Sequence, residues 1–140
     1  MNLKALTLIP VLGLAALLSA CAGTMPKPDP HDAWVGLQEE ARDNMLAEQL
    51  DGHPLKDGRY FQVAPGKHSM QVVVYAASSV YVDDKTCHGT LAYAHFKPDE
   101  HYQLRETSTG MSMGLALGVD LVNDRGRTVA HTDQFTCAAG

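Results

Sequence analysis

Residues Leu50 to Tyr75, LDGHPLKDGRYFQVAPGKHSMQVVVY, decide the fold of this chain. Apolar and polar residues alternate on both sides of an Ala-Pro-Gly-Lys turn, with Phe61 and Val63 before it and Met70 and Val72 after it. A period of two indicates strands rather than a helix. Proline followed by glycine suits the central positions of a type II turn. The stretch therefore predicts two strands joined as a hairpin.

Alternation of the same kind continues on either side of this stretch. Residues 38–50 are ambiguous, and we expect a polar loop or helical turn to about Asn44 and then a strand to Leu50. The other predicted strands are 33–37, 87–96, 101–107, 115–121 and 127–137. The side chains expected in the core are Phe61, Val72, Val74, Leu91, Tyr93, Leu104, Leu117 and Val119. Seven or eight strands predict an all-β fold, an antiparallel β-sandwich of immunoglobulin-like or transthyretin-like kind, with a small closed barrel as the alternative.

The first twenty residues have the pattern of a signal peptide. Lys4 precedes an apolar run from Ala5 to Leu18, which is too short and wrongly flanked for a membrane-spanning helix. Leu18-Ser19-Ala20-Cys21 resembles the lipobox of bacterial lipoproteins. That resemblance implies cleavage before Cys21 and lipidation of this cysteine, whereas an ordinary secretory signal is the alternative. Ala22 at the next position, where aspartate is absent, favours the outer membrane by the same resemblance.

Removal of residues 1–20, which contain one lysine and no acid, leaves 120 residues with 16 acidic and 10 basic side chains and a net charge of −6. This acidic balance argues against binding to nucleic acid or to a membrane through a basic surface. Residues 21–32 contain three prolines and predict an extended tether. We expect residues 33–140 to form one domain.

The segment DGHPLKDGRYFQVAPGKHSMQV also resembles the PEGA type of small β-domain. The residues that carry the match are Asp51, Gly52, Pro65, Gly66 and His68. The whole chain, from its lipobox to its late cysteine pair, is similar to a group of small uncharacterised bacterial lipoproteins. This resemblance implies a location in the cell envelope and a fold, but no activity.

Two cysteines remain after Cys21. An exported compartment is oxidising, so Cys87 and Cys137 are expected to form a disulfide. The bridge would close a loop of about 50 residues and stabilise the fold by roughly 4 kcal/mol in the chain-entropy model. Both cysteines lie on the apolar parity of their predicted strands, which is compatible with a buried disulfide. A pair of metal-binding thiolates is the alternative.

Metal binding and catalysis have weak sequence signals. The seven histidines show neither the H-x-H nor the H-x-x-x-H spacing of common metal sites. Met111 and Met113, with His68, form a possible Cu(I) site. The chain contains no G-x-S-x-G, no S-x-x-K and no phosphate-binding glycine loop. We therefore expect no enzyme activity, no cofactor and no metal.

Recognition by a sandwich falls to its loops or a strand edge, here expected at 51–58, 83–86 and 108–114. The first loop predicts a polar contact patch made of Asp51, His53, Asp57 and Arg59. The sequence thus predicts a lipid-anchored, non-catalytic module of the bacterial envelope, structural or binding, with an envelope protein or a glycan as its partner. The alternatives are a periplasmic protein that binds copper or zinc and a small inhibitor of a cell-wall hydrolase.

Overall fold

The computed structural model describes residues 27–38, 43–76, 85–107, 109–111 and 114–139. The predicted signal peptide, Cys21 and the first part of the tether lie outside these ranges. Within them the chain forms strands and no helix, and hence no helix long and apolar enough to cross a membrane. The twelve strands are β1 (Ala33–Gln38), β2 (Asp43–Leu50), β3 (His53–Pro54), β4 (Tyr60–Val63), β5 (Gly66–Ala76), β6 (Lys85–Phe96), β7 (His101–Glu106), β8 (Thr109–Met111), β9 (Gly114–Ala116), β10 (Val119–Asn123), β11 (Thr128–Thr132) and β12 (Phe135–Ala139).

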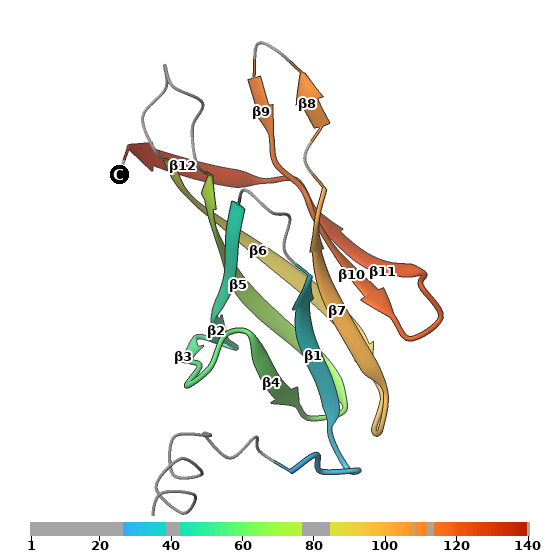
Figure 1. Ribbon diagram of the computed structural model, residues 1–140. Helices are drawn as coiled ribbons and strands as arrows, with labels where there is room; N and C mark the ends of the chain where they lie inside the picture. Colours follow the sequence, from blue (N-terminus) through green and yellow to red (C-terminus); the bar gives the residue numbers. More distant parts are fainter. Residues whose placement is uncertain (1–26, 39–42, 77–84, 108, 112–113, 140) are drawn as a thin grey trace, which may run out of the picture.

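Ten of these strands form two five-stranded sheets. Sheet A has the order β11-β10-β7-β1-β4, and sheet B has the order β12-β6-β5-β2-β3. Figure 1 shows the two sheets as two layers, with the short β8–β9 pair projecting beyond one end of them. The all-β prediction is confirmed.

One apolar core lies between the two sheets. Seven of the eight side chains predicted to point inward are buried, and Tyr93 is half-buried and packs against the same core. Burying aliphatic and aromatic side chains is the main term that holds such layers together, at about 25 cal/mol per Å² of apolar surface. The core residues are Ala33, Val35, Met45, Ala47, Phe61, Val63, Met70, Val72, Val74, Cys87, Leu91, Phe96, Tyr102, Leu104, Leu117, Val119 and Leu121.

The predicted hairpin across Pro65 is wrong. β4 pairs with β1 in sheet A, whereas β5 pairs with β2 and β6 in sheet B. Gly66 has the positive φ that the turn chemistry demands, at 111°, but the turn carries the chain from one layer to the other. Alternation on both sides of the turn shows only that each strand has one face in the core, and strands of two facing sheets satisfy this condition equally well.

The sheets are also not uniformly antiparallel as predicted. β1 runs parallel to β7, with Trp34 opposite His101 and Leu37 opposite Leu104, so sheet A is mixed. The other pairings, including all of those in sheet B, are antiparallel. Hydrophobic alternation is the same in parallel and antiparallel strands, and it therefore contains no information about direction.

The strand count exceeds the seven or eight predicted because several segments are divided. The predicted strand 127–137 becomes β11 in sheet A and β12 in sheet B, separated by residues 133–134. The predicted strand 115–121 is likewise divided between β9 and β10, and the predicted loop 108–114 contributes β8 and the first residue of β9. In the predicted loop 83–86, residues 85–86 begin β6, and residues 83–84 lie outside the described ranges.

The disulfide prediction is confirmed. Cys87 on β6 and Cys137 on β12 are direct cross-strand partners with their Cα atoms 4.0 Å apart, and their sulfur atoms are bonded. Cys87 is buried, but Cys137 is exposed because β12 is the edge strand of sheet B. The disulfide, which the strand pattern allowed to be buried, is therefore buried at Cys87 only.

The two Asp-Gly pairs of the predicted loop 51–58 occur for different physical reasons. Asp51 and Gly52 both have positive φ, at 51° and 79°, and connect paired residues Leu50 and His53, which is the two-residue hairpin turn that an Asp-Gly pair favours. Gly58 is required for space, since a Cβ there would lie 1.9 Å from the carbonyl oxygen of Ala47. The strand predicted to end at Leu50 is confirmed as β2, and residues 39–42 lie outside the described ranges.

Candidate functional site

The predicted contact patch divides into two local clusters. In the first, the Asp51 carboxylate accepts hydrogen bonds from Nδ1 of His68 at 2.5 Å and from the backbone amide of Ser69 at 2.9 Å. His53 Nδ1 donates to the carbonyl oxygen of Asp51 at 3.1 Å. The hydrogen bond from His68, helped by that from Ser69, holds the pKa of Asp51 below its usual value. These contacts tie the β2–β3 turn to β5, which is a structural task.

The second cluster is the exposed pair of Asp57 and Arg59. The Asp57 carboxylate accepts hydrogen bonds from the backbone amide of Arg59 at 2.9 Å and from its Nε at 3.2 Å. Hydrogen bonds from the Arg59 side chain and backbone hold the pKa of Asp57 below its usual value. This pair lines a groove of about 560 Å³ together with Leu46 and Leu55 from β2 and the loop after β3.

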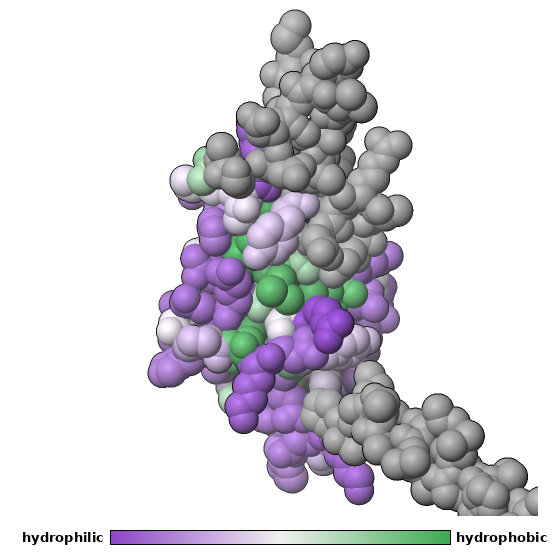
Figure 2. Space-filling view, turned by 60° about the vertical axis from the view of Figure 1, so that its left-hand side comes forward, coloured by the Kyte–Doolittle hydropathy of each residue, from purple (hydrophilic) through white to green (hydrophobic). Residues whose placement is uncertain are grey.

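Figure 2 turns the sheet B side of the molecule forward and shows apolar surface surrounded by hydrophilic side chains. Leu46 and Leu55 are both half-buried and line the groove beside Asp57. Neither Asp51 nor His53 is among the described residues that line it. Two of the four residues of the predicted patch, Asp57 and Arg59, therefore line this groove, and the other two do not.

A second candidate site lies on the outer face of sheet A. Asp120 on β10 is only 8% exposed although it lies on this face. Its carboxylate accepts hydrogen bonds from His131 Nδ1 at 2.6 Å, from the Thr128 hydroxyl at 3.0 Å and from the Arg105 guanidinium at 3.3 Å. Burial raises the pKa of Asp120, but the three hydrogen bonds outweigh burial and hold it below its usual value. One ionised carboxylate thus links β7, β10 and β11.

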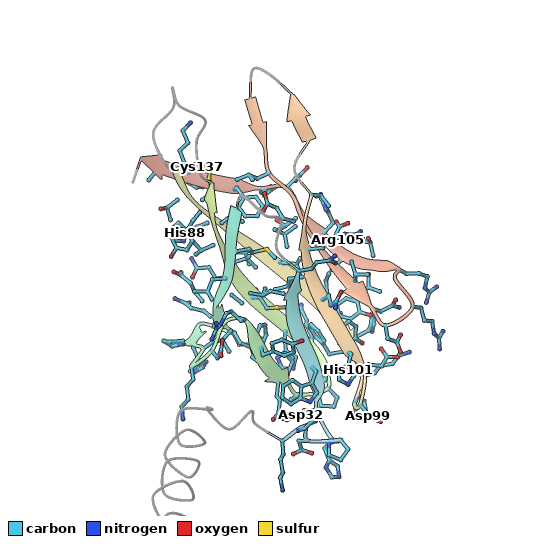
Figure 3. The ribbon with its side chains drawn as sticks, viewed as in Figure 1. Asp32, His88, Asp99, His101, Arg105 and Cys137 are labelled. Carbon is cyan, nitrogen blue, oxygen red and sulfur yellow. A yellow bond between two sulfur atoms is a disulfide. The ribbon has the colours of Figure 1, made fainter. Side chains whose placement is uncertain are left out.

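The Asp120 network borders a groove of about 300 Å³, which we call the β7 groove. Arg105 belongs to both, and in Figure 3 it and His101 are labelled on β7. Val122 contributes an apolar side chain that is 7% exposed. The polar residues that line the β7 groove are Gln38, His101, Gln103, Arg105, Asn123 and Asp124.

An aromatic pair lies on the same face of sheet A beside the β7 groove. Tyr60 on edge strand β4 is 50% exposed, and Trp34 on β1 is 7% exposed. The Tyr60 ring extends across β1 over Gly36, where a Cβ would lie 3.3 Å from its Cζ. The two ring centroids are 6.4 Å apart, so Trp34 supports the tyrosine ring. Gly36 in turn pairs with Gln103, a residue of the groove.

The structure does not describe the side chains of two of the three residues considered for a Cu(I) site. His68 is held by Asp51, Met113 lies outside the described ranges, and only the backbone of Met111 is described. Among the described residues, no group of three or more His, Cys, Asp or Glu side chains is placed to hold a metal ion.

Sequence reasoning missed the β7 groove and the Asp120 network. The predicted strand 101–107 contains Gln103 and Arg105, but nothing in the sequence brought Gln38 and Asp120 beside them. The signal available in the sequence was Asp120, which lies between Val119 and Leu121 on a strand. Because these two neighbours point inward, the Asp120 carboxylate must point outward, where it can be paired. No family model, curated protein or solved structure matches the chain.

Proposed function

We propose that this chain is a lipid-anchored, non-catalytic binding module of the bacterial cell envelope. The observation that carries the proposal is the sequence Leu18-Ser19-Ala20-Cys21 directly after an apolar run with one preceding lysine. Lipidation of Cys21 would add two or three acyl chains, which anchor a protein far more firmly than one chain. With Ala22 at the next position, we assign the protein to the outer membrane, facing the periplasm.

The disulfide supports the proposed compartment. Cys87–Cys137 is a structural bridge between neighbouring strands, and such bridges persist in oxidising compartments such as the periplasm. Residues 21–32 would then act as the tether that holds the β-domain away from the membrane. We propose an immunoglobulin-like or transthyretin-like sandwich as the architecture of this domain.

The hydrogen bonding of Asp120 and the polar lining of the β7 groove favour binding over catalysis. Asp120 is surrounded by three donors that fix its carboxylate, so it is poorly placed to act as a base or nucleophile. The β7 groove offers amides, an arginine and a histidine on a rigid sheet, which suits recognition of a polar ligand. An envelope protein or a glycan is the class of partner proposed.

The test of the anchor is metabolic labelling with a radioactive fatty acid in a Gram-negative host. Cys21→Ser should abolish labelling and leave an unprocessed precursor or a soluble product. Ser19→Ala is the matched control, because it keeps a small residue before the cysteine and should keep the label. Fatty-acid labelling that survives Cys21→Ser would contradict the proposal.

A further inference from the structure

We propose that the outer face of sheet A binds a saccharide, with the β7 groove as its polar site and the Tyr60 ring as its stacking surface. The inference rests on the proposed function of a binding module and names its ligand class and site. Among the described residues, none from the loops predicted for recognition, 51–58, 83–86 and 108–114, lines the β7 groove. Strands β1, β7 and β10 and the turn after β10 form it instead.

The strand register places the recognition groups on one face. Gln38 pairs with Arg105, and Gln103 pairs with Val122, so the side chains of β1, β7 and β10 lie side by side. Neighbouring strands are about 4.8 Å apart, which brings three such rows within the width of one or two sugar rings. Asn123 at the end of β10 and Asp124 in the following turn also line the groove.

Tyr60 supplies the apolar part of the site. Its ring is half exposed, lies across Gly36 and is supported by Trp34, so a ligand can stack on it with little loss of side-chain freedom. Because Gly36 is the register partner of Gln103, the tyrosine hydroxyl end points from β4 towards the β7 groove. A sugar ring presents C–H groups on one face and hydroxyls at its edge, which matches this combination.

The charges of the site also favour a saccharide. Arg105 is 43% exposed at its side chain but is already oriented by Asp120, so it presents its remaining N–H donors in a fixed direction. Glutamine and asparagine amides each offer donors and an acceptor, the pattern that hydroxyl and acetamide groups require. Asp124 also lines the groove, Arg105 is paired with Asp120, and the chain carries a net charge of −5, which together disfavour a nucleic acid at this site.

The test uses the full chain in a detergent without a sugar headgroup and three probes: tetramers of N-acetylglucosamine, glucose and galacturonic acid. Binding is followed by amide chemical shifts in NMR and by the Kd from titration. We expect at least one tetramer to bind and to shift the amides of β7 and β10. Tyr60→Ala should weaken this binding by roughly tenfold, and Gln103→Ala by a similar factor.

Tyr75→Ala is the matched control, because Tyr75 is 43% exposed but lies on β5 of sheet B, and it should leave the Kd unchanged. Lack of binding to all three tetramers would overturn the inference. Equal weakening by Tyr60→Ala and Tyr75→Ala, or shifts confined to sheet B, would overturn it as well. None of these results would contradict the lipid anchor, which is tested separately by the loss of fatty-acid labelling in Cys21→Ser. Failure of the saccharide proposal can therefore be distinguished from failure of the proposed anchor.

Discussion

β11 and β12 follow each other in the sequence, but they are edge strands of different sheets. Each is linked to its neighbouring strand by a different kind of bond. β12 is joined to β6 of sheet B by the covalent Cys87–Cys137 bridge. β11 is joined to β10 of sheet A by side-chain hydrogen bonds from Thr128 and His131 to the Asp120 carboxylate. Only residues 133–134 separate the two strands.

The comparison shows that the link at one edge strand is sensitive to redox potential and the link at the other is sensitive to pH. The disulfide depends on redox potential and is insensitive to moderate changes of pH. The Asp120 network depends on the charge of one carboxylate and is insensitive to reductants. At these two edges the link adds to the backbone pairing of a strand that has a strand neighbour on one side only.

The largest effect is expected from loss of the disulfide. The Cys21→Ser chain retains only Cys87 and Cys137 as cysteines. Because these two are joined in a disulfide, neither should react with an alkylating reagent until a reductant is added. Replacing both by alanine should lower the free energy of unfolding by roughly 4 kcal/mol, measured by urea denaturation. Two free thiols in the native, unreduced protein would contradict the bridge.

Loss of the Asp120 carboxylate should have the next largest effect. Asp120→Ala leaves Arg105, Thr128 and His131 without their shared acceptor, and we expect a loss of about 1–3 kcal/mol in the free energy of unfolding. Asp124→Ala is the control, because this exposed aspartate lies in the nearby turn and should change stability by less than about 0.5 kcal/mol. The loss should be the same with and without reductant. Equal effects of the two substitutions would show that the network does not hold β11.

The same carboxylate should make sheet A sensitive to acid. Since the folded-state pKa of Asp120 lies below its ordinary value of 3.8, its stabilising effect is present above that value and is lost as the pH falls through the lowered pKa. We therefore expect the stability difference between the natural chain and Asp120→Asn to shrink below about pH 4. The other acidic groups are common to both proteins, so this difference isolates Asp120. A difference that is constant from pH 7 to pH 2.5 would contradict the pKa direction.

Local chemistry predicted much of this fold. Alternation placed Leu104 and Val119 in the core, where both are buried. Cys87 and Cys137 were the two cysteines left after Cys21, and an oxidising compartment predicted the disulfide between them. Neighbours distant in the sequence could not be predicted. The parallel partner of β1 and the assignment of β4 and β5 to different sheets depend on how the layers pack, which alternation does not encode.

The candidate site shows the same limit. The four residues of the predicted patch are close in the sequence, but Asp51 and His53 serve the β2–β3 turn, while Asp57 and Arg59 line a groove. The β7 groove instead combines β1 with β7 and β10, whose outward residues are ordinary when each strand is considered alone. Its recognition required the cross-strand register.

The smallest effect is expected at the opposite edge of sheet B, where neither a covalent bond nor a buried carboxylate holds β3. The Asp51 side chain is 44% exposed, and its contact with His68 links the β2–β3 turn to β5. Because solvent screens this pair, loss of the contact in Asp51→Ala should cost no more than about 1 kcal/mol, apart from the strain of alanine at a φ of 51°. Its local effect should be clear, because the Ser69 amide loses its side-chain acceptor and should exchange faster with deuterated solvent.

Asp51→Asn sharpens this last prediction. Asparagine tolerates the positive φ of 51° at this position and retains an oxygen that can accept from Ser69. It removes the negative charge and replaces the oxygen that accepts from His68 by an amide NH2 group. We therefore expect slow Ser69 exchange in Asp51→Asn and fast exchange in Asp51→Ala, measured by amide hydrogen exchange at pH 7. Slow exchange in both variants, or a loss of global stability as large as that of Asp120→Ala, would contradict a local role for Asp51 at the β3 edge.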